Sequence, residues 1–456
     1  MKHSQNRKKF SLLSFRDTET RHESRPTLLG SPSLMSKGHR GKFKIKTGAL
    51  AFSFFLITRT IAIFLSFPCL SDVGLYLDFF IRGHVFGMTP YSGFSVEYPP
   101  LAFFISYIPG LALAQDISFE RYYLIFALMM FFIDYCCLKT CQFYCKENLK
   151  MNERETAYMT LLYSLFGLLM FKIIYHRLDM AVGFFIIISL VLFQAKKKHL
   201  PFNFFANAFL GFFYKIIPAF NVPIAIIAKA FKNSGTKKII VKIILDSAIF
   251  AAALVIGIWV IEIFANHHFI ENMAVHGKRG IQLESSYGSL LLLKNLLLGN
   301  NDSPVYYQYF SWNILGNSVV EFMAKILGSV VFLIFYAALF FTFLRKKIAF
   351  SNSNFLEATF VTLLLFLSFQ RVLSTQFFIW IIPIAAIWLA KNRSLKSLLV
   401  FLLLYLCTFF IFSINYMALT RELPLLVLIL ALRNFILVGF TCFITVNFFK
   451  NLNEQN

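Results

Sequence analysis

Residues 47–78 read TGALAFSFFLITRTIAIFLSFPCLSDVGLYLD, and this stretch decides the fold. Its apolar part, Thr47 to Pro68, has the length that a helix needs to cross a bilayer. The residues before it carry twelve Lys or Arg against three acids, which indicates the cytoplasmic side of a membrane. Asp72 and Asp78 are therefore expected just past the outer end of a first transmembrane helix.

The composition of the whole chain is that of a membrane protein. Of its 456 residues, 58% are hydrophobic and 14% are charged, and the mean hydropathy is +0.67. A soluble protein of this length could not hide so much apolar surface from water. The net charge of +22 comes from short basic clusters between apolar runs. It therefore indicates membrane topology and argues against nucleic-acid binding.

The apolar runs predict an all-α polytopic protein with about 12 transmembrane helices. We expect a basic, disordered cytoplasmic tail over 1–46, a single transmembrane domain over 47–449 and a short cytoplasmic tail over 450–456. Outer loops of about 69–99 and 265–321 follow the first and the seventh helix. The predicted spans are 47–68, 100–114, 122–144, 156–175, 180–194, 201–231, 239–264, 322–344, 356–369, 376–390, 398–414 and 425–449.

A second folding scheme fits the same sequence. With twelve spans, the basic segments 146–154 and 196–198 lie outside, against the tendency of Lys and Arg to remain in the cytoplasm. They lie inside if 100–114 and 201–231 are re-entrant hairpins broken by prolines. Residues 175–179 then move to the outer face. The sequence leaves both schemes open.

The outer loops carry candidate functional residues. Asp72 has no local charged partner, which favours a reactive role. Asp78 and Arg82 are one helical turn apart and fit an ordinary surface ion pair. In the second loop, His276 and Arg279 provide cations of the kind that an anionic phosphate headgroup needs at the outer membrane face. A solvated loop that merely contains charges is the alternative interpretation.

Arg59 and Lys215 are cations inside predicted spans, where a charge costs at least about 2.5 kcal/mol to insert. Arg59 lies in the first span, and Asp134 in the third span is a plausible ion-pair partner. Lys215 lies beside helix-breaking prolines, which favours a place in the wall of a cavity over contact with lipid.

Six short motifs occur in order between Asp72 and Pro383, and together they resemble the GT-C class of polyprenyl-phosphate-sugar-dependent glycosyltransferases. The resemblance is to the bacterial mannosyltransferase-like branch related to the phosphatidylinositol-mannoside elongating enzyme. Two places depart from the family pattern: Ser374-Thr375-Gln376-Phe377 stands where Ser-Pro-Gln-Tyr is common, and Arg177-Leu178-Asp179 replaces a more usual turn. The motifs are Asp72-x3-Tyr76, Gly87-x2-Pro90-Tyr91, Glu97-Tyr98-Pro99-Pro100-Leu101, Lys215-x2-Pro218, His276-x2-Arg279-Gly280-x-Gln282-x-Glu284-Ser285 and Ser374-x-Gln376-x3-Trp380-x2-Pro383.

The resemblance implies a GT-C fold and an inverting transfer of a sugar, mannose or another hexose, from a polyprenyl-phosphate donor to a lipid-linked or envelope glycan acceptor. Asp72 would be the general base, and Arg279, His276 and Lys215 would bind the donor phosphate. The sugar and the acceptor would contact seven further residues: Asp78, Tyr76, Glu97, Tyr98, Gln282, Glu284 and Gln376.

No cofactor or metal is required under this interpretation, and the sequence has no Gly-rich phosphate loop for a nucleotide. The expected location is the bacterial inner membrane, with a cytoplasmic N-terminus and a site on the periplasmic side. The expected partners are the lipid bilayer, the lipid-phosphate donor and a glycolipid or glycan acceptor. Two other classes remain open, a flippase or transporter of lipid-linked sugar and an O-antigen ligase or polymerase.

Overall fold

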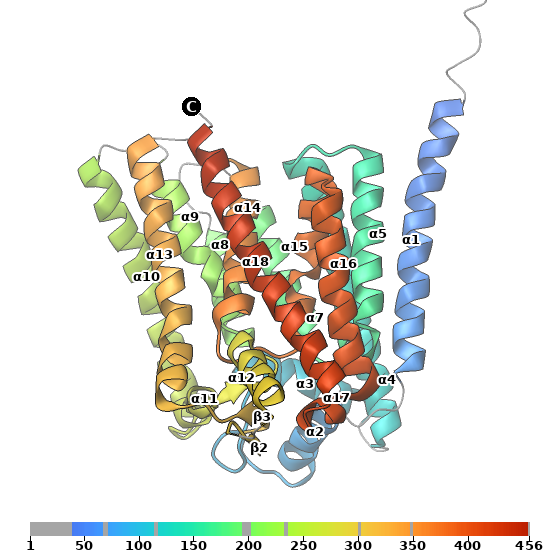
Figure 1. The fold of residues 1–456 in the computed structure, drawn as a ribbon, viewed down its shortest axis with the longest axis vertical. Coiled ribbons are helices and arrows are strands. Elements are labelled where there is room, and N and C mark those ends of the chain that lie inside the picture. Colours follow the sequence, from blue (N-terminus) through green and yellow to red (C-terminus); the bar gives the residue numbers. More distant parts are fainter. Residues whose placement is uncertain are drawn as a thin grey trace, which may run out of the picture. The chain divides into compact units, whose positions relative to one another are not determined.

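The computed structural model describes residues 39–66, 72–113, 117–193, 202–231, 236–299, 302–346 and 350–454. Within it, long helices run side by side, and many of the short helices and strands between them gather at one end (Figure 1). The expected all-α polytopic fold is confirmed, because seven helices of the described residues are long and apolar enough to cross a membrane. These are α1 (His39–Leu65), α4 (Phe119–Phe143), α10 (Thr236–Phe264), α13 (Ser318–Lys346), α14 (Asn352–Phe369), α16 (Leu395–Phe409) and α18 (Pro424–Glu454).

Shorter helices and helical turns complete the chain, and the residues from Lys44 onward form one unit. The first helix begins at His39 rather than at Thr47, and the rest of the predicted tail, 1–38, lies outside the described residues. The shorter elements are α2 (Asp72–Phe80), η1 (Ile81–Val85), α3 (Pro100–Leu113), η2 (Tyr144–Asn148), α5 (Glu153–Leu169), α6 (Phe171–Ile174), α7 (Asp179–Leu192), α8 (Phe202–Tyr214), η3 (Ile217–Phe220), α9 (Asn221–Ala230), α11 (Phe269–Lys278), α12 (Ser286–Leu298), α15 (Phe377–Asn392), η4 (Phe410–Ile414) and α17 (Asn415–Thr420).

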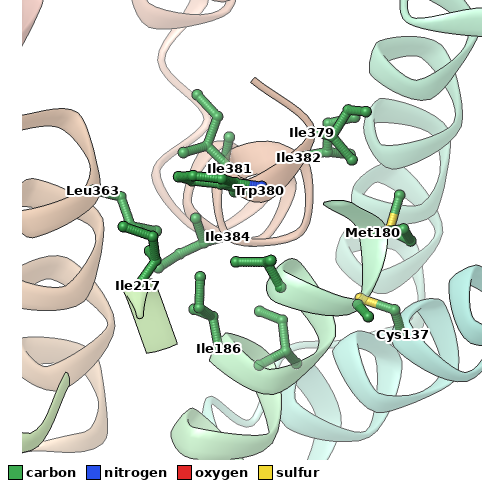
Figure 2. Packing of buried hydrophobic residues seen from close by; sticks show 14 of the residues in the cluster. Cys137, Met180, Ile186, Ile217, Leu363, Ile379, Trp380, Ile381, Ile382 and Ile384 are labelled. Atoms are coloured by element: carbon green, nitrogen blue, oxygen red, sulfur yellow. The ribbon is translucent and has the colours of Figure 1, made fainter. Parts of the chain in front are cut away.

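Helix α15 lies in the interior of the bundle. Its residues are buried from Phe378 to Ala390, as expected for a helix that is apolar on every side. Figure 2 shows Trp380 of α15 near Ile217 of η3 and Leu363 of α14, with Ile186 of α7 below it. The position of Trp380 matters for the site described below, because this packing fixes its indole nitrogen.

Three short strands form a sheet that the sequence did not predict. The order is β1 (Ile281–Gln282), β3 (Ser311–Ile314) and β2 (Val305–Gln308), and both pairs are antiparallel. Tyr309 and Phe310 connect β2 to β3 with φ angles of 52° and 56°, the left-handed values of a tight hairpin turn. The sheet lies in the segment between α11 and α13 that was predicted as an outer loop.

The two ends of the bundle can be told apart by ion pairs. Arg177 forms an ion pair with Asp72, so the turn between α6 and α7 lies at the same end as α2; we call this the Asp72 end. At the other end of α5, Glu155 pairs with Arg393 at 2.7 Å. The basic segment 146–154 therefore lies at the opposite end, whereas Lys196–Lys198 fall outside the described residues.

Helix α3 does not traverse the bundle. It packs on α2 and α4, and the Tyr107 hydroxyl in its middle donates to the Phe80 carbonyl of α2 at 3.4 Å. The described residues of the predicted span 100–114 therefore remain at the Asp72 end.

Helices α8 and α9 form a hairpin. At the opposite end, Phe204 near the start of α8 packs on Phe355 at a ring distance of 6.1 Å, and Phe231 after α9 packs on Phe343 at 6.0 Å. Between them the chain turns at Lys215, which pairs with Asp179 beside the Asp72 end. Of the two schemes that the sequence leaves open, the structure matches the one with re-entrant segments.

Candidate active site

A cavity of about 900 Å³ opens at the Asp72 end. Its lining contains apolar side chains, here called the apolar wall, and polar or charged ones, here called the polar wall. The polar wall comes from α2, the segment before α3, the turn before α7, the β1 region and the start of α15, among others. The apolar wall includes Phe212, Phe213, Ile216, Ile217, Ile258 and Ile270.

Asp72 is the first residue of α2, where a carboxylate is favoured by the helix dipole. Its Oδ2 atom forms the ion pair with Arg177 Nη1 and accepts a hydrogen bond from the Tyr98 hydroxyl at 3.2 Å. The Tyr76 hydroxyl in turn donates to the Tyr98 oxygen at 3.2 Å. Both contacts of Asp72 use the same oxygen, so Oδ1 is not engaged by either of them.

Lys215 follows directly on α8, at a point where Pro218 prevents the helix from continuing. Its Nζ pairs with Asp179 Oδ1 at 2.8 Å, and the indole Nε1 of Trp380 donates to the same oxygen at 2.5 Å. Lys215 also lies over the rings of Tyr98 and Trp380, with its Nζ 5.9 and 5.7 Å from their centroids. The prediction that this lysine lines a cavity is confirmed.

Arg279 ends α11 and faces the cavity. Its Nη2 donates to Glu97 Oε2 at 2.7 Å, and its Nε donates to the Tyr309 carbonyl at 3.1 Å. Burial raises the pKa of Glu97, although the charges of Arg279 and Lys215 oppose this rise. The guanidinium is thus held in place from two sides.

His276, predicted to bind the donor phosphate, is among the residues that line the cavity. Its Nε2 lies 2.7 Å from the Glu97 carbonyl, which can only accept, so Nε2 carries the proton. The side chain is exposed toward the cavity, yet desolvation by surrounding protein and the charge of Arg279 lower its pKa. Both effects favour the neutral imidazole, and the cavity lining also holds the cations Arg177, Lys215 and Arg279.

Gln282 and Glu284 lie side by side in the polar wall. The Gln282 side chain is buried, and its Oε1 has no hydrogen-bond partner among the described residues. Glu284 Oε2 accepts from the Thr375 hydroxyl, and burial raises the pKa of its carboxyl group. The Glu284 carbonyl accepts from Arg433 Nη2 at 2.6 Å, which anchors this segment to α18.

The structure brings most of the predicted site residues together. Tyr76 is not among the lining residues, and its hydroxyl contacts Tyr98, which is. Asp78 is also not among them: it pairs with Arg82 at 2.7 Å, with both side chains nearly half exposed, as expected for an ordinary surface ion pair. The predicted residues that line the cavity are Asp72, Glu97, Tyr98, Lys215, His276, Arg279, Gln282, Glu284 and Gln376.

Sequence reasoning missed the roles of Arg177, Asp179 and Tyr416. Arg177 and Tyr416 line the cavity, and Asp179 holds Lys215. The tendency of Lys and Arg to remain in the cytoplasm could have indicated Arg177 and Asp179. It favours the re-entrant scheme, in which residues 175–179 lie at the outer face. With these additions, each cation of the wall has a carboxylate partner: Arg177 with Asp72, Lys215 with Asp179 and Arg279 with Glu97.

The described residues contain no group of three or more His, Cys, Asp or Glu side chains arranged to hold a metal ion. No protein-family model matches the sequence, and no curated protein matches it. Among solved structures, the fold is similar to ArnT from Cupriavidus metallidurans bound to undecaprenyl phosphate. The identity is 12% and the TM-score 0.45, over 90% of this chain and 78% of that chain. A likeness this distant assigns no function, so the functional argument rests on the cavity itself.

Proposed function

We propose that this chain is a GT-C-class inverting glycosyltransferase that uses a polyprenyl-phosphate sugar as donor. The observation that carries the proposal is one cavity lined both by apolar side chains and by cations with a carboxylate. A lipid-phosphate sugar has the matching parts, an apolar chain, an anionic phosphate and a polar sugar. The sequence motifs favour mannose or another hexose as the sugar and a lipid-linked or envelope glycan as the acceptor.

Asp72 is the proposed general base. It takes the proton from an acceptor hydroxyl, whose oxygen then forms a bond to C1 of the donor sugar while the bond from C1 to the phosphate oxygen breaks. Attack opposite the phosphate inverts the configuration at C1. The electron pair of the broken bond leaves on the lipid phosphate, so no general acid is required.

Three cations are placed to stabilise that phosphate. Arg177, Lys215 and Arg279 line the same cavity as Asp72, and preorganised cations stabilise charge that develops on a leaving group. Each is oriented by its carboxylate partner before the donor binds. Gln282, with its unpaired buried amide oxygen, is suited to accept a hydrogen bond from a sugar hydroxyl.

We also propose that the Asp72 end faces outward from a bacterial inner membrane, with the N-terminus in the cytoplasm. Basic residues at the opposite end support this orientation, since cytoplasmic segments are enriched in Lys and Arg. They include Lys146, Lys150, Arg154, Lys391 and Arg393.

A transfer assay in membranes tests the proposal with a panel of undecaprenyl-phosphate sugars. Asp72→Asn is expected to reduce product formation at least about 100-fold, the usual minimum for loss of a general base. Asp78→Asn is the matched control, since it removes a carboxylate from the same helix outside the cavity, and it is expected to leave transfer unchanged. Undiminished product with Asp72→Asn, or translocation of intact donor without transfer, contradicts the proposal. The second result would indicate a flippase.

A further inference from the structure

A charged pair lies in the interior of the helix bundle, away from the cavity. Arg59 Nε of α1 donates to Asp134 Oδ2 of α4 at 2.7 Å, and both side chains are fully buried. The sequence predicted this pairing, and the structure confirms it. Burying two charges is costly, and apolar replacements of such pairs are often as stable or more stable. Charge neutralisation alone therefore does not explain why the pair is present.

The Asp134 carboxylate also receives two tyrosine hydroxyls. Tyr175 donates to Oδ2 at 2.7 Å, and Tyr163 of α5 donates to Oδ1. Tyr175 is two residues before Arg177, in the turn that connects α6 to α7. Through this hydroxyl, the buried pair is linked to the turn that reaches the cavity.

The same turn is held at its other end. Leu178 accepts from the Tyr214 hydroxyl at 2.6 Å, and Asp179 accepts from Lys215 and Trp380. Arg177 lies between these anchors and Tyr175. Hydrogen bonds therefore hold the turn on both sides of Arg177.

Arg59 is itself fixed against α5. Its Nη1 donates to the Ser164 carbonyl at 3.0 Å, and its guanidinium lies over the rings of Phe55 and Tyr163 at 4.9 and 5.3 Å. The backbone of Gly167 leaves room for the guanidinium, since a Cβ atom there would overlap it. Arg59 therefore holds Asp134 in one position relative to α5.

We propose that Arg59 and Asp134 are positioning residues which, through the Tyr175 hydroxyl, hold the turn at 175–179 so that Arg177 reaches Asp72. The effect on turnover rests on the proposed transferase function, whereas the effect on the position of Arg177 does not. Arg59, Asp134 and Tyr175 are not among the residues that line the cavity.

The test measures the reactivity of Arg177 toward phenylglyoxal in the purified full-length protein, quantified by peptide mass spectrometry. Tyr175→Phe removes the hydroxyl of the turn that donates to Asp134. Tyr163→Phe removes the hydroxyl of α5 that donates to the same carboxylate. We expect Tyr175→Phe to increase labelling of Arg177 about fivefold, the factor that corresponds to one net hydrogen bond of ~1 kcal/mol. Tyr163→Phe is expected to leave it unchanged, and Arg279 is the internal reference in each sample.

Equal labelling of Arg177 in wild type and Tyr175→Phe overturns the proposal, as does an equal increase in both tyrosine variants. Should Tyr175→Phe fail to fold, the double variant Arg59→Met with Asp134→Leu removes the pair and keeps apolar packing. It is expected to label Arg177 faster than wild type, and unchanged labelling overturns the proposal. In the transfer assay, Tyr175→Phe is expected to lower kcat more than it changes the KM for acceptor. A chain without transferase activity would still give the labelling result.

Discussion

Arg279 Nη2 lies 2.7 Å from Glu97 Oε2, and this ion pair joins two segments that are 182 residues apart in the sequence. Both side chains are mostly buried, with 14% and 12% of their surfaces exposed. One segment precedes α3, and the other connects α11 to the small sheet. The pair thus holds the two segments together at the cavity and orients Arg279 toward its interior.

Replacing Arg279 by Gln is expected to change the pH dependence of stability. Burial raises the pKa of Glu97 above its ordinary 4.5, and Arg279 opposes the rise. An acid with a raised pKa in the folded state loses stability as the pH increases from its unfolded value through its folded value. Without Arg279 this loss extends to higher pH, so the melting temperature of the variant falls further between mildly acidic and neutral pH.

The double variant Arg279→Gln with Glu97→Gln is the control for this prediction. It lacks the titrating group, so its melting curve is expected to follow pH less steeply than that of Arg279→Gln alone. Parallel curves for the two variants would rule out Glu97 as the source of the effect.

Lys215→Met is expected to destabilise the protein by about 3–5 kcal/mol, because it leaves the buried Asp179 charge without its cation. Adding Asp179→Asn removes that charge and is expected to restore most of the stability. The double variant should still bind the donor poorly, since it lacks one cation of the proposed phosphate site. Thermal unfolding measures the effect on stability, and the KM for the donor measures the effect on binding. If the double variant recovered both, Lys215 would not belong to the proposed phosphate site.

Gly167→Ala is expected to lower stability by about 1–3 kcal/mol, the usual effect of overpacking a filled core. The added methyl group would overlap the Arg59 guanidinium. Gly439→Ala in α18 is the matched control, because among the described residues, apart from its chain neighbours and its own helix backbone, no heavy atom lies within 4 Å of the methyl group it adds. Thermal unfolding of both variants compares the sites, and equal melting temperatures would mean that Arg59 can move at no cost.

Cysteine labelling on intact cells is expected to place Lys150 and Arg82 on opposite sides of the membrane. Both side chains are exposed, at 76% and 46%. A membrane-impermeant maleimide should react with Arg82→Cys from outside and with Lys150→Cys only after permeabilisation. Labelling of Lys150→Cys in intact cells would favour the twelve-span scheme and contradict the re-entrant one.

The apolar runs predicted the helical segments well, because length and hydropathy alone distinguish a membrane span. It was harder to predict which of these segments cross the bundle and which turn back. Segments 100–114 and 201–231 are apolar enough to be counted as spans, and only the neighbours they pack against show that they turn back. The hairpin between β2 and β3 was missed for a local reason: Tyr309 and Phe310 form its turn, where Asn-Gly or another Gly-containing pair is the usual signal.

The sequence motifs predicted many of the residues of the candidate site, but they did not predict which of these residues form ion pairs with one another. Glu97, Arg279 and Gln282 were named from the order of short motifs. Arg177 was passed over because its partner, Asp72, belongs to a segment more than a hundred residues earlier, and only the packing of α4, α5 and α7 brings them together. Asp78 was named among the residues that the resemblance implies for sugar or acceptor binding, and it is not among the residues that line the cavity.

The internal neutralisation of the cavity cations has a consequence for selectivity. A phosphate that binds there shares each cation with a carboxylate, so it gains less from the cation than it would from an unpaired one. A small free anion such as inorganic phosphate has only this reduced attraction, whereas a phosphate joined to a long hydrocarbon also gains the contact with the apolar wall. At Arg177 the carboxylate that shares the cation belongs to Asp72. In the proposed transferase, a donor phosphate bound to Arg177 would therefore weaken the ion pair that occupies Oδ2 of the base.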